Sequence, residues 1–277
     1  MPLFYSTGCS QNRELDLVLR QLGQFTKNIE LSGGLQADEA MLDKVLGYQK
    51  QGFNFLVHNY FPPLNDWFIL NMVDPRPHTQ NFVQRSMEAV AALGLDYYSI
   101  HPGLTREYAF SDKKPYCTGL EFPPEQTKAF VDWFFAQYPN HYLAIENLYP
   151  VWGILDISYG MTLEQIRGFL ELDPRVRLLL DLGHLKVAAT KLHYDYDQAV
   201  TTYFEEWGHL IKEIHLSHND GSDDHHQLVE PGSKQHQILV RYQDLINRQG
   251  INVTVEGMGY SHEELVQNHA FLSQLIN

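Results

Sequence analysis

Short apolar stretches alternate with amphipathic stretches along the whole chain. The apolar stretches are rich in Ile, Val, Leu, Tyr and Phe, which favour β-strands. They predict eight strands, at Leu3–Thr7, Lys27–Leu31, Phe53–His58, Tyr97–His101, Tyr142–Glu146, Val176–Asp181, Ile211–His215 and Asn252–Glu256. Helical spacing of apolar residues between them predicts helices at Ala37–Gln51, His78–Leu93, Pro124–Tyr138, Leu163–Leu172, Asp197–Gly208, His236–Gln249 and His262–Ile276.

Two of these helices are preceded by residues that favour a helix start. Thr162 stands three residues before Gln165, and Ser261 stands three residues before Glu264. This spacing is typical of a capping box, in which the two side chains bind each other's backbone N–H groups.

Eight strand-then-helix units in 277 residues predict an α/β protein with the (β/α)8 TIM-barrel fold, formed by residues 1–277 as a single domain. The main rival is a doubly wound open sheet, but no GxGxxG turn follows the first predicted strand. Three long connections, Asn59–Pro77, Pro102–Phe122 and Ser217–Gln235, follow strands. They are expected at the carboxyl-terminal face, where barrel enzymes carry their active sites.

Charge and cysteine usage narrow the function. Twenty basic and 34 acidic residues give a formal net charge of −14, which disfavours duplex DNA as a partner. Cys9 and Cys117 are far apart, so a disulfide framework is not expected. The N-terminus lacks a basic segment followed by an apolar one, and no apolar run approaches the ~20 residues of a membrane span. We therefore expect a cytoplasmic protein without a membrane segment.

The ends of six consecutive predicted strands carry residue types that bind metal ions. These residues are His58, His101, Glu146, Asp181, His215 and Glu256. His184 follows closely after one of them, and Asp223 and His225 lie in the loop after the seventh strand. Leu56, Ala144 and Leu179 stand two residues below three of the ligands, as expected for an inner layer of the barrel.

These nine candidates are more than one ion needs, since one ion takes roughly four to six ligands. Two or three divalent ions per chain are the natural count, and a single ion remains an alternative. Imidazole and carboxylate ligands suit zinc, with manganese or iron as alternatives.

Several runs of the sequence resemble endonuclease IV-type enzymes (AP endonuclease family 2). More broadly, they resemble the xylose isomerase-like TIM barrel superfamily, which includes sugar phosphate isomerases and epimerases. The runs are His58-Asn59-Tyr60, His101-Pro102-Gly103, Glu146-Asn147, Asp181-Leu182-Gly183-His184, His215-Leu216, Asp223-Asp224-His225-His226 and Glu256. The nuclease branch holds three zinc ions with nine ligands, and all nine types occur here in order.

The resemblance implies how the ligands are shared out. Glu146 would bridge, and His58 and His101 would serve one ion. A second ion would be held by Asp181, His215 and Glu256, and a third by His184, Asp223 and His225.

The first two strand–helix units depart from the nuclease pattern. The segment Cys9-Ser10-Gln11 lacks a basic, aromatic DNA-gripping loop, and Glu30-Leu31-Ser32-Gly33-Gly34 is more similar to the second strand of sugar isomerase relatives. Together with the negative charge, these departures favour a small sugar or phosphoester substrate over abasic DNA.

Three function classes remain open. A multinuclear centre favours phosphoester hydrolysis, with Glu256 or Glu146 orienting water and His184 stabilising the leaving group. A single ion held by Glu146, Asp181, His215 and Glu256 favours sugar isomerisation or epimerisation, with Glu146 and Glu256 moving the proton and His184 touching a substrate oxygen. The third class is a metal-binding barrel without catalysis, as a sensor or structural protein.

The strand phase also places two charged residues inside the barrel. Arg177 lies four residues before Asp181, and Glu213 lies two residues before His215. Because a buried unpaired charge is costly, we expect the two side chains to approach each other or a shared polar partner.

Overall fold

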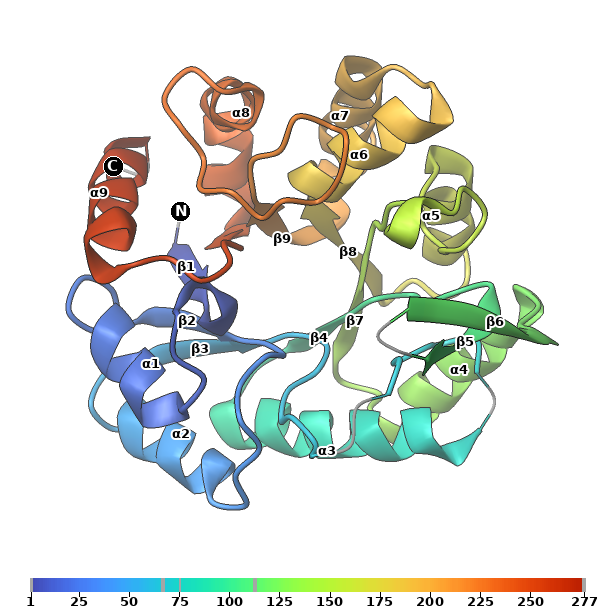
Figure 1. The fold of residues 1–277 in the computed structure, drawn as a ribbon, viewed down its shortest axis with the longest axis horizontal. Helices are drawn as coiled ribbons and strands as arrows, with labels where there is room; N and C mark the ends of the chain where they lie inside the picture. Colours follow the sequence, from blue (N-terminus) through green and yellow to red (C-terminus); the bar gives the residue numbers. More distant parts are fainter. Residues whose placement is uncertain (1, 66–67, 75, 112–113, 276–277) are drawn as a thin grey trace.

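Eight parallel strands form a nearly closed barrel surrounded by helices in the computed structural model, which describes residues 2–65, 68–74, 76–111 and 114–275 (Figure 1). The strands follow the order β3-β2-β1-β10-β9-β8-β7-β4. Their bounds are β1 Leu3–Ser6, β2 Asn28–Leu31, β3 Asn54–Val57, β4 Tyr97–Ile100, β7 Tyr142–Glu146, β8 Val176–Asp181, β9 Ile211–Leu216 and β10 Asn252–Val255. All eight predicted strands are therefore confirmed, as is the predicted TIM barrel.

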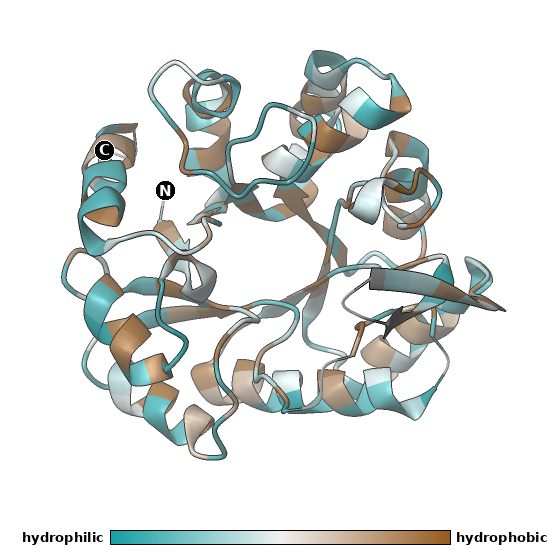
Figure 2. Cartoon of the chain, viewed as in Figure 1, coloured by the Kyte–Doolittle hydropathy of each residue, from teal (hydrophilic) through white to brown (hydrophobic). Residues whose placement is uncertain are grey.

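Helices cover the outside of the barrel. They are α1 Leu15–Leu22, α2 Met41–Gln49, α3 Pro77–Leu93, α4 Glu125–Gln137, α5 Leu163–Leu170, α6 Leu182–Leu192, α7 Tyr196–Glu205, α8 Lys234–Gln249 and α9 His262–Leu272. Short 3-10 turns occupy η1 Thr7–Cys9, η2 Val151–Gly153, η3 Gly208–Leu210 and η4 Ser273–Leu275. The strands are mostly apolar, whereas the helices carry both polar and apolar residues (Figure 2). Among the described residues, no helix is long and apolar enough to cross a membrane.

The pattern of apolar residues did not reveal every element. Helices α1 and α6 were not predicted, and α6 begins directly after β8 because the Asp181 carboxylate caps it. The connection predicted as the loop Pro102–Phe122 contains an antiparallel hairpin of β5 Arg106–Ser111 and β6 Lys114–Glu121. Pro115 and Gly119 interrupt the strand pattern of β6, which hides it in the sequence.

The two predicted caps differ in the structure. Ser261 and Glu264 form a complete capping box. The Thr162 side chain accepts from the backbone N–H of Gln165, but the Gln165 side chain accepts from the N–H of Met161 instead of Thr162. The predicted box at α5 is therefore only half formed.

The interior of the barrel holds its own apolar layer, separate from the core beneath the helices. It consists of Phe4, Leu56, Tyr97, Ala144 and Leu179. Leu56, Ala144 and Leu179 are thus the inner-layer residues that the strand phase predicts. This layer fills the barrel directly below the strand ends and gives the polar residues above it an apolar floor.

Arg177 and Glu213 do not pair as predicted. Glu213 is fully buried and accepts hydrogen bonds from the Tyr97 and Thr254 hydroxyls. The Arg177 guanidinium donates to the backbone carbonyls at positions 174 and 176 and lies over the Tyr142 ring, 4.3 Å from its centroid. Its long side chain reaches solvent and carbonyl acceptors, so it needs no buried carboxylate.

The two ends of the sheet order, β3 and β4, meet where the barrel closes. Their contact is a bridge between His58, just after β3, and Ser99 of β4, and the N–H of Asn59 donates to the carbonyl of Ser99 at 2.8 Å. The barrel therefore closes at the height of its carboxyl-terminal rim.

Candidate metal centre

The six strand-end residues meet above the apolar floor of the barrel. Within the described residues, three groups have ligand atoms within 4.8 Å of one another. One contains His58, His101 and Glu146, and a second contains Glu146, Asp181, His215 and Glu256. The third contains Glu30, His58 and His215. All six predicted strand-end residues are thus brought together, because the carboxyl ends of parallel strands converge at one rim.

Glu146 lies at the centre of this cluster and is fully buried. Its Oε2 atom is 3.0 Å from Nε2 of His101 and 3.4 Å from Nε2 of His58. Its Oε1 atom is 2.9 Å from Nδ1 of His184 and 3.8 Å from Nδ1 of His215. One carboxylate therefore faces two different sets of donors, one with each oxygen.

His215 presents Nδ1 to the second group. This nitrogen is 3.2 Å from Oε2 of Glu256 and 3.9 Å from Oδ2 of Asp181. Asp181 uses its other oxygen, Oδ1, to accept from the N–H of His184 at 2.6 Å and so cap α6. The cap fixes the carboxylate and leaves Oδ2 facing the cluster.

The loop after β9 extends the cluster through Asp224 and His226. Oδ2 of Asp224 is 3.3 Å from Nε2 of His184 and 2.7 Å from Nε2 of His226. Asp223 and His225, the predicted pair, do not join the cluster: the His225 imidazole is exposed and points toward Asp220 and Ser222.

The two residues of this loop that reach the cluster, Asp224 and His226, therefore each lie one position later in the sequence than the predicted Asp223 and His225. The Asp223-Asp224-His225-His226 run contains the Asp-x-His spacing in two overlapping frames, and the structure uses the second one. Paired backbone hydrogen bonds between His218 and Gln227 fix the returning chain, and His226 has a left-handed backbone with φ of 46°. Asp223 and His225 are exposed, whereas Asp224 and His226 are partly buried, so a one-residue shift in this segment exchanges inner and outer side chains.

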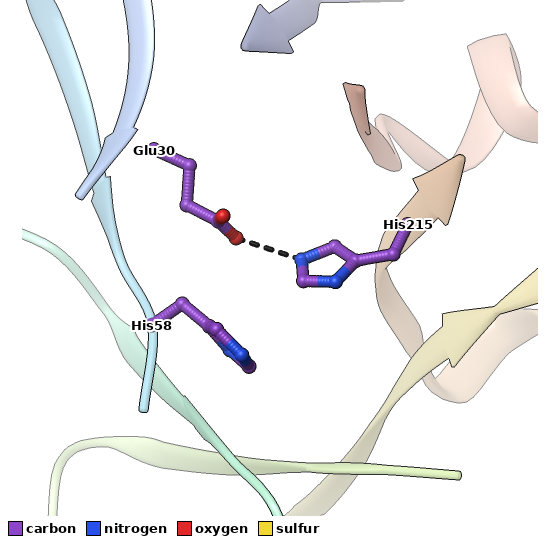
Figure 3. A group of neighbouring side chains, drawn as sticks. All are labelled: Glu30, His58 and His215. Carbon is purple, nitrogen blue, oxygen red and sulfur yellow. Dashed lines mark hydrogen bonds and ion pairs between the residues drawn. The ribbon is translucent and has the colours of Figure 1, made fainter. Parts of the chain in front are cut away.

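Glu30 of β2 is a member of the cluster that was not predicted from the sequence. Its side chain is fully buried, and Oε2 lies 2.7 Å from Nε2 of His215 (Figure 3). The sequence contained a signal for it, because Glu30 is a carboxylate between Ile29 and Leu31 in an apolar strand. Such a residue inside a barrel needs a polar partner.

Burial and mutual attraction shift the pKa values of the cluster in opposite directions. Burial lowers the pKa of His58 to about 4, so its imidazole is neutral at neutral pH. Burial raises the pKa of Asp181 to about 7, with Glu256 and Glu146 adding to the rise. Against burial, which would lower it, Glu256 and Asp224 raise the pKa of His226 to about 9.

The two carboxylates that face several imidazoles shift the other way. Burial alone would raise the pKa of Glu146, but His101 and His184 hold it well below its usual range. Burial would also raise the pKa of Glu256, and His215 and His226 hold it below its usual range. Both groups are therefore carboxylates at neutral pH, the form that binds cations.

The unsatisfied atoms of the cluster fit divalent metal ions. Among the described residues, neither oxygen of Glu146 receives a hydrogen bond of good geometry, and the same is true of Oδ2 of Asp181 and Oδ1 of Asp224. Buried carboxylate oxygens without donors are costly. Cations bound between neutral imidazoles and carboxylates would satisfy them, and these ligand types are those that zinc and related ions prefer.

A pocket of about 190 Å³ opens onto the cluster. His101, His226 and Glu256 contribute to its wall, as do Tyr60 and Met258. Glu146 and His184, two of the three predicted catalytic residues, are not among the described residues that line it. No Lys or Arg is found among those lining residues either. A bound anionic group would therefore meet carboxylates and imidazoles unless cations are present.

Solved structures with the same fold include both sugar enzymes and nucleases. A D-tagatose 3-epimerase-like protein matches with a TM-score of 0.70 and 13% identity, covering 100% of this chain and 97% of its own. Endonuclease IV from Thermus thermophilus matches with a TM-score of 0.62 and 15% identity, covering 100% of this chain and 99% of its own. AP endonuclease, family 2, from Brucella melitensis matches with a TM-score of 0.67 and 14% identity, covering 99% of each chain.

Neither a family model nor a curated protein matches the sequence. At these identities, the structural matches establish the barrel fold and its topology.

Proposed function

We propose that the protein is a metal-dependent hydrolase that cleaves phosphoester bonds in small, sugar-containing molecules. One observation carries the proposal: the buried Glu146 carboxylate faces two donor groups, His58 with His101 on one side and Asp181, His215 and Glu256 on the other. A carboxylate shared in this way is suited to bridge two ions. Asp224 contacts both His184 and His226, and these three side chains supply donors for a third ion.

In this proposal the first two ligand sets contain the residues predicted from the sequence, and only the third set differs. His58, His101 and Glu146 hold one ion, and Glu146, Asp181, His215 and Glu256 hold another. His184, Asp224 and His226 hold the third. Divalent ions in such centres lower the pKa of water and offset the negative charge of a phosphoester.

The remaining roles belong to side chains at the pocket wall. Glu256 retains 18% exposure and lines the pocket, so it is placed to orient a water molecule by accepting its proton. Glu146 has no exposure and serves as a ligand only. His226 lines the pocket, so we assign it, in place of the buried His184, to hold an ion beside the departing oxygen, whose negative charge that ion would offset.

The size and charge of the protein favour a small substrate. The pocket of about 190 Å³ matches a single sugar unit better than a duplex, and the net charge of −14 repels a polyanion. The barrel is shared with a D-tagatose 3-epimerase-like protein and with endonuclease IV, so both sugar and phosphoester chemistry are compatible with it.

A second candidate is a sugar isomerase or epimerase with one ion. It is favoured by the group Glu146, Asp181, His215 and Glu256, which offers four donors without help from the rest of the cluster. Glu146 and Glu256 would then exchange a proton at the carbon beside the carbonyl of the substrate.

The test is metal content followed by activity. Protein purified without chelator should contain two or three equivalents of zinc, manganese or iron by elemental analysis. It should then hydrolyse chromogenic phosphomonoesters or phosphodiesters of small alcohols, and Glu146→Gln should lose both metal and activity. One equivalent of metal, together with exchange of a substrate C–H proton for solvent deuterium in a ketose panel, would establish the epimerase instead. Incision of abasic duplex DNA at comparable efficiency would contradict the small-substrate proposal.

A further inference from the structure

We propose that Glu30 is a positioning residue for His215. By accepting a hydrogen bond from Nε2–H, it holds the proton on Nε2 and leaves the lone pair of Nδ1 facing the other carboxylates. The inference deepens the proposed function, since it rests on His215 as a metal ligand.

The contact joins two side chains from opposite sides of the barrel. Glu30 lies on β2, and His215 lies on β9; both are fully buried, and their side chains meet in the interior (Figure 3). The distance between Oε2 of Glu30 and Nε2 of His215 is 2.7 Å. A charge-assisted hydrogen bond of this length is strong, and a carboxylate can only accept, so the imidazole must donate.

The opposite edge of the same imidazole faces the predicted ligands. Nδ1 lies 3.2 Å from Oε2 of Glu256, 3.8 Å from Oε1 of Glu146 and 3.9 Å from Oδ2 of Asp181. Two donors on one zinc ion, each at ~2.0–2.2 Å, lie roughly 3.3–3.6 Å apart in a tetrahedral site. The spacings around Nδ1 are close to this range, whereas the 2.7 Å at Nε2 is the length of a hydrogen bond.

Two roles are open to Glu30: ligand of a separate ion, or orienting partner of the ligand His215. The group of Glu30, His58 and His215 is close enough to suggest an ion of its own. Because Nδ1 faces the three other carboxylates and Nε2 has Glu30 at hydrogen-bond distance, the geometry instead makes Glu30 the orienting partner of a ligand. A carboxylate, histidine and metal in series is a common arrangement, and it fixes both the tautomer and the ring orientation.

Glu30 depends on this hydrogen bond. Its other oxygen, Oε1, receives no hydrogen bond from the described residues, and its strand neighbours Ile29 and Leu31 are apolar. A second buried carboxyl, Glu213, approaches Nε2 of His215 only to 3.8 Å and accepts from Tyr97 and Thr254 instead. Glu213→Gln is therefore a matched control for Glu30→Gln, because both remove a buried carboxyl beside the same imidazole.

The first measurement is metal binding by the full-length protein. Zinc affinity, measured by competition with a chromogenic chelator, should fall about 10–100-fold at one site in Glu30→Gln, with unchanged stoichiometry. Glu213→Gln should keep the affinity of the original protein. Loss of a whole equivalent of zinc in Glu30→Gln would make Glu30 a ligand, and unchanged affinity would remove its role; either result overturns the proposal.

The second measurement needs no metal. Long-range ¹H–¹⁵N correlation spectra of the metal-free protein, recorded at a pH where His215 is neutral, should show its proton on Nε2. In Glu30→Gln this preference should weaken, because an amide can either accept from the ring or donate to it. A proton on Nδ1 in the original protein would overturn the proposal. If the protein binds no zinc but His215 is protonated on Nε2, the proposed function fails while the positioning role of Glu30 stands.

Discussion

His58 and Ser99 face each other across the closure of the barrel, with Nδ1 of His58 3.0 Å from Oγ of Ser99. The Ser99 hydroxyl donates to the carbonyl of Val57, so it accepts from the imidazole and leaves Nε2 of His58 without a proton. That nitrogen faces Glu146. The side chain of Ser99 thus holds His58 in the tautomer that a metal ligand at Nε2 requires.

Ser99→Ala should weaken metal binding at the group of His58, His101 and Glu146. Removing the acceptor frees the His58 ring to change tautomer, and we expect about a 10-fold loss of zinc affinity at one site. Stability should fall by about 1 kcal/mol for the lost hydrogen bond. Ser86→Ala is the control, since Ser86 is equally buried but bonds to the backbone of α3. It should cost similar stability without changing affinity, and equal zinc affinity in the two variants would refute the role of Ser99.

The Asp-x-His frame in the loop after β9 can be tested with paired substitutions. Asp224→Asn and His226→Ala should each lose one equivalent of metal, because both side chains contact the His184 end of the cluster. Asp223→Asn and His225→Ala should retain full metal content, because neither side chain reaches the cluster. Elemental analysis of the four proteins checks this, and the opposite pattern would restore the frame predicted from sequence.

Glu213 should make the protein less stable as pH rises. Burial raises its pKa to about 8, above the ordinary value of 4.5. The folded state therefore keeps a proton that the unfolded chain has lost between these values, so stability falls as pH rises through this window. Glu213→Gln removes the effect, and a pKa that is raised by one pH unit corresponds to about 1.4 kcal/mol of stability.

The comparison uses urea unfolding of both proteins in the same metal state. Relative to the original protein, Glu213→Gln should gain little at pH 5 and on the order of 2–4 kcal/mol at pH 9. His226, whose raised pKa acts in both proteins, cancels in the difference. A difference that does not change with pH would contradict the prediction.

Gly103 should tolerate no side chain. A Cβ there would lie 2.1 Å from Oδ1 and 2.8 Å from Cα of Asn71, and its φ is +101°. Gly119 has a similar φ of +91° but no atom within 4 Å of its Cβ position. Gly119→Ala should therefore cost about 1–2 kcal/mol from backbone strain alone, and Gly103→Ala a further 1–3 kcal/mol, roughly, from the clash. Chemical unfolding of both variants measures the difference, and equal losses would show that Asn71 moves aside.

The strands and the candidate ligands at their ends were predictable because both follow a simple rule. Apolar runs mark buried parallel strands, and their carboxyl ends meet at one rim, so residues such as His101 and Asp181 converge whatever the details of the loops. Helix α6 was missed because it begins within the run Asp181-Leu182-Gly183-His184, which was interpreted as candidate metal ligands and not as a helix start.

The remaining differences concern side-chain direction. The choice between Asp223 and Asp224 depends on how the chain returns through Gln227, which no local periodicity encodes. Glu30 looked like one polar residue in an apolar strand, and its partner lies 185 residues away in the sequence.

The closure between β3 and β4 has a mechanical consequence. Within the described residues, these strands share one bridge in place of a continuous ladder; His58 is one of its two residues, and His101 lies two residues after the other, Ser99. An ion bound by both histidines would cross-link β3 and β4, the two edge strands of an otherwise open sheet. Metal binding would then slow amide hydrogen exchange in β3 and β4 more than in the strands across the barrel. Separation of β3 from β4 would become less favourable.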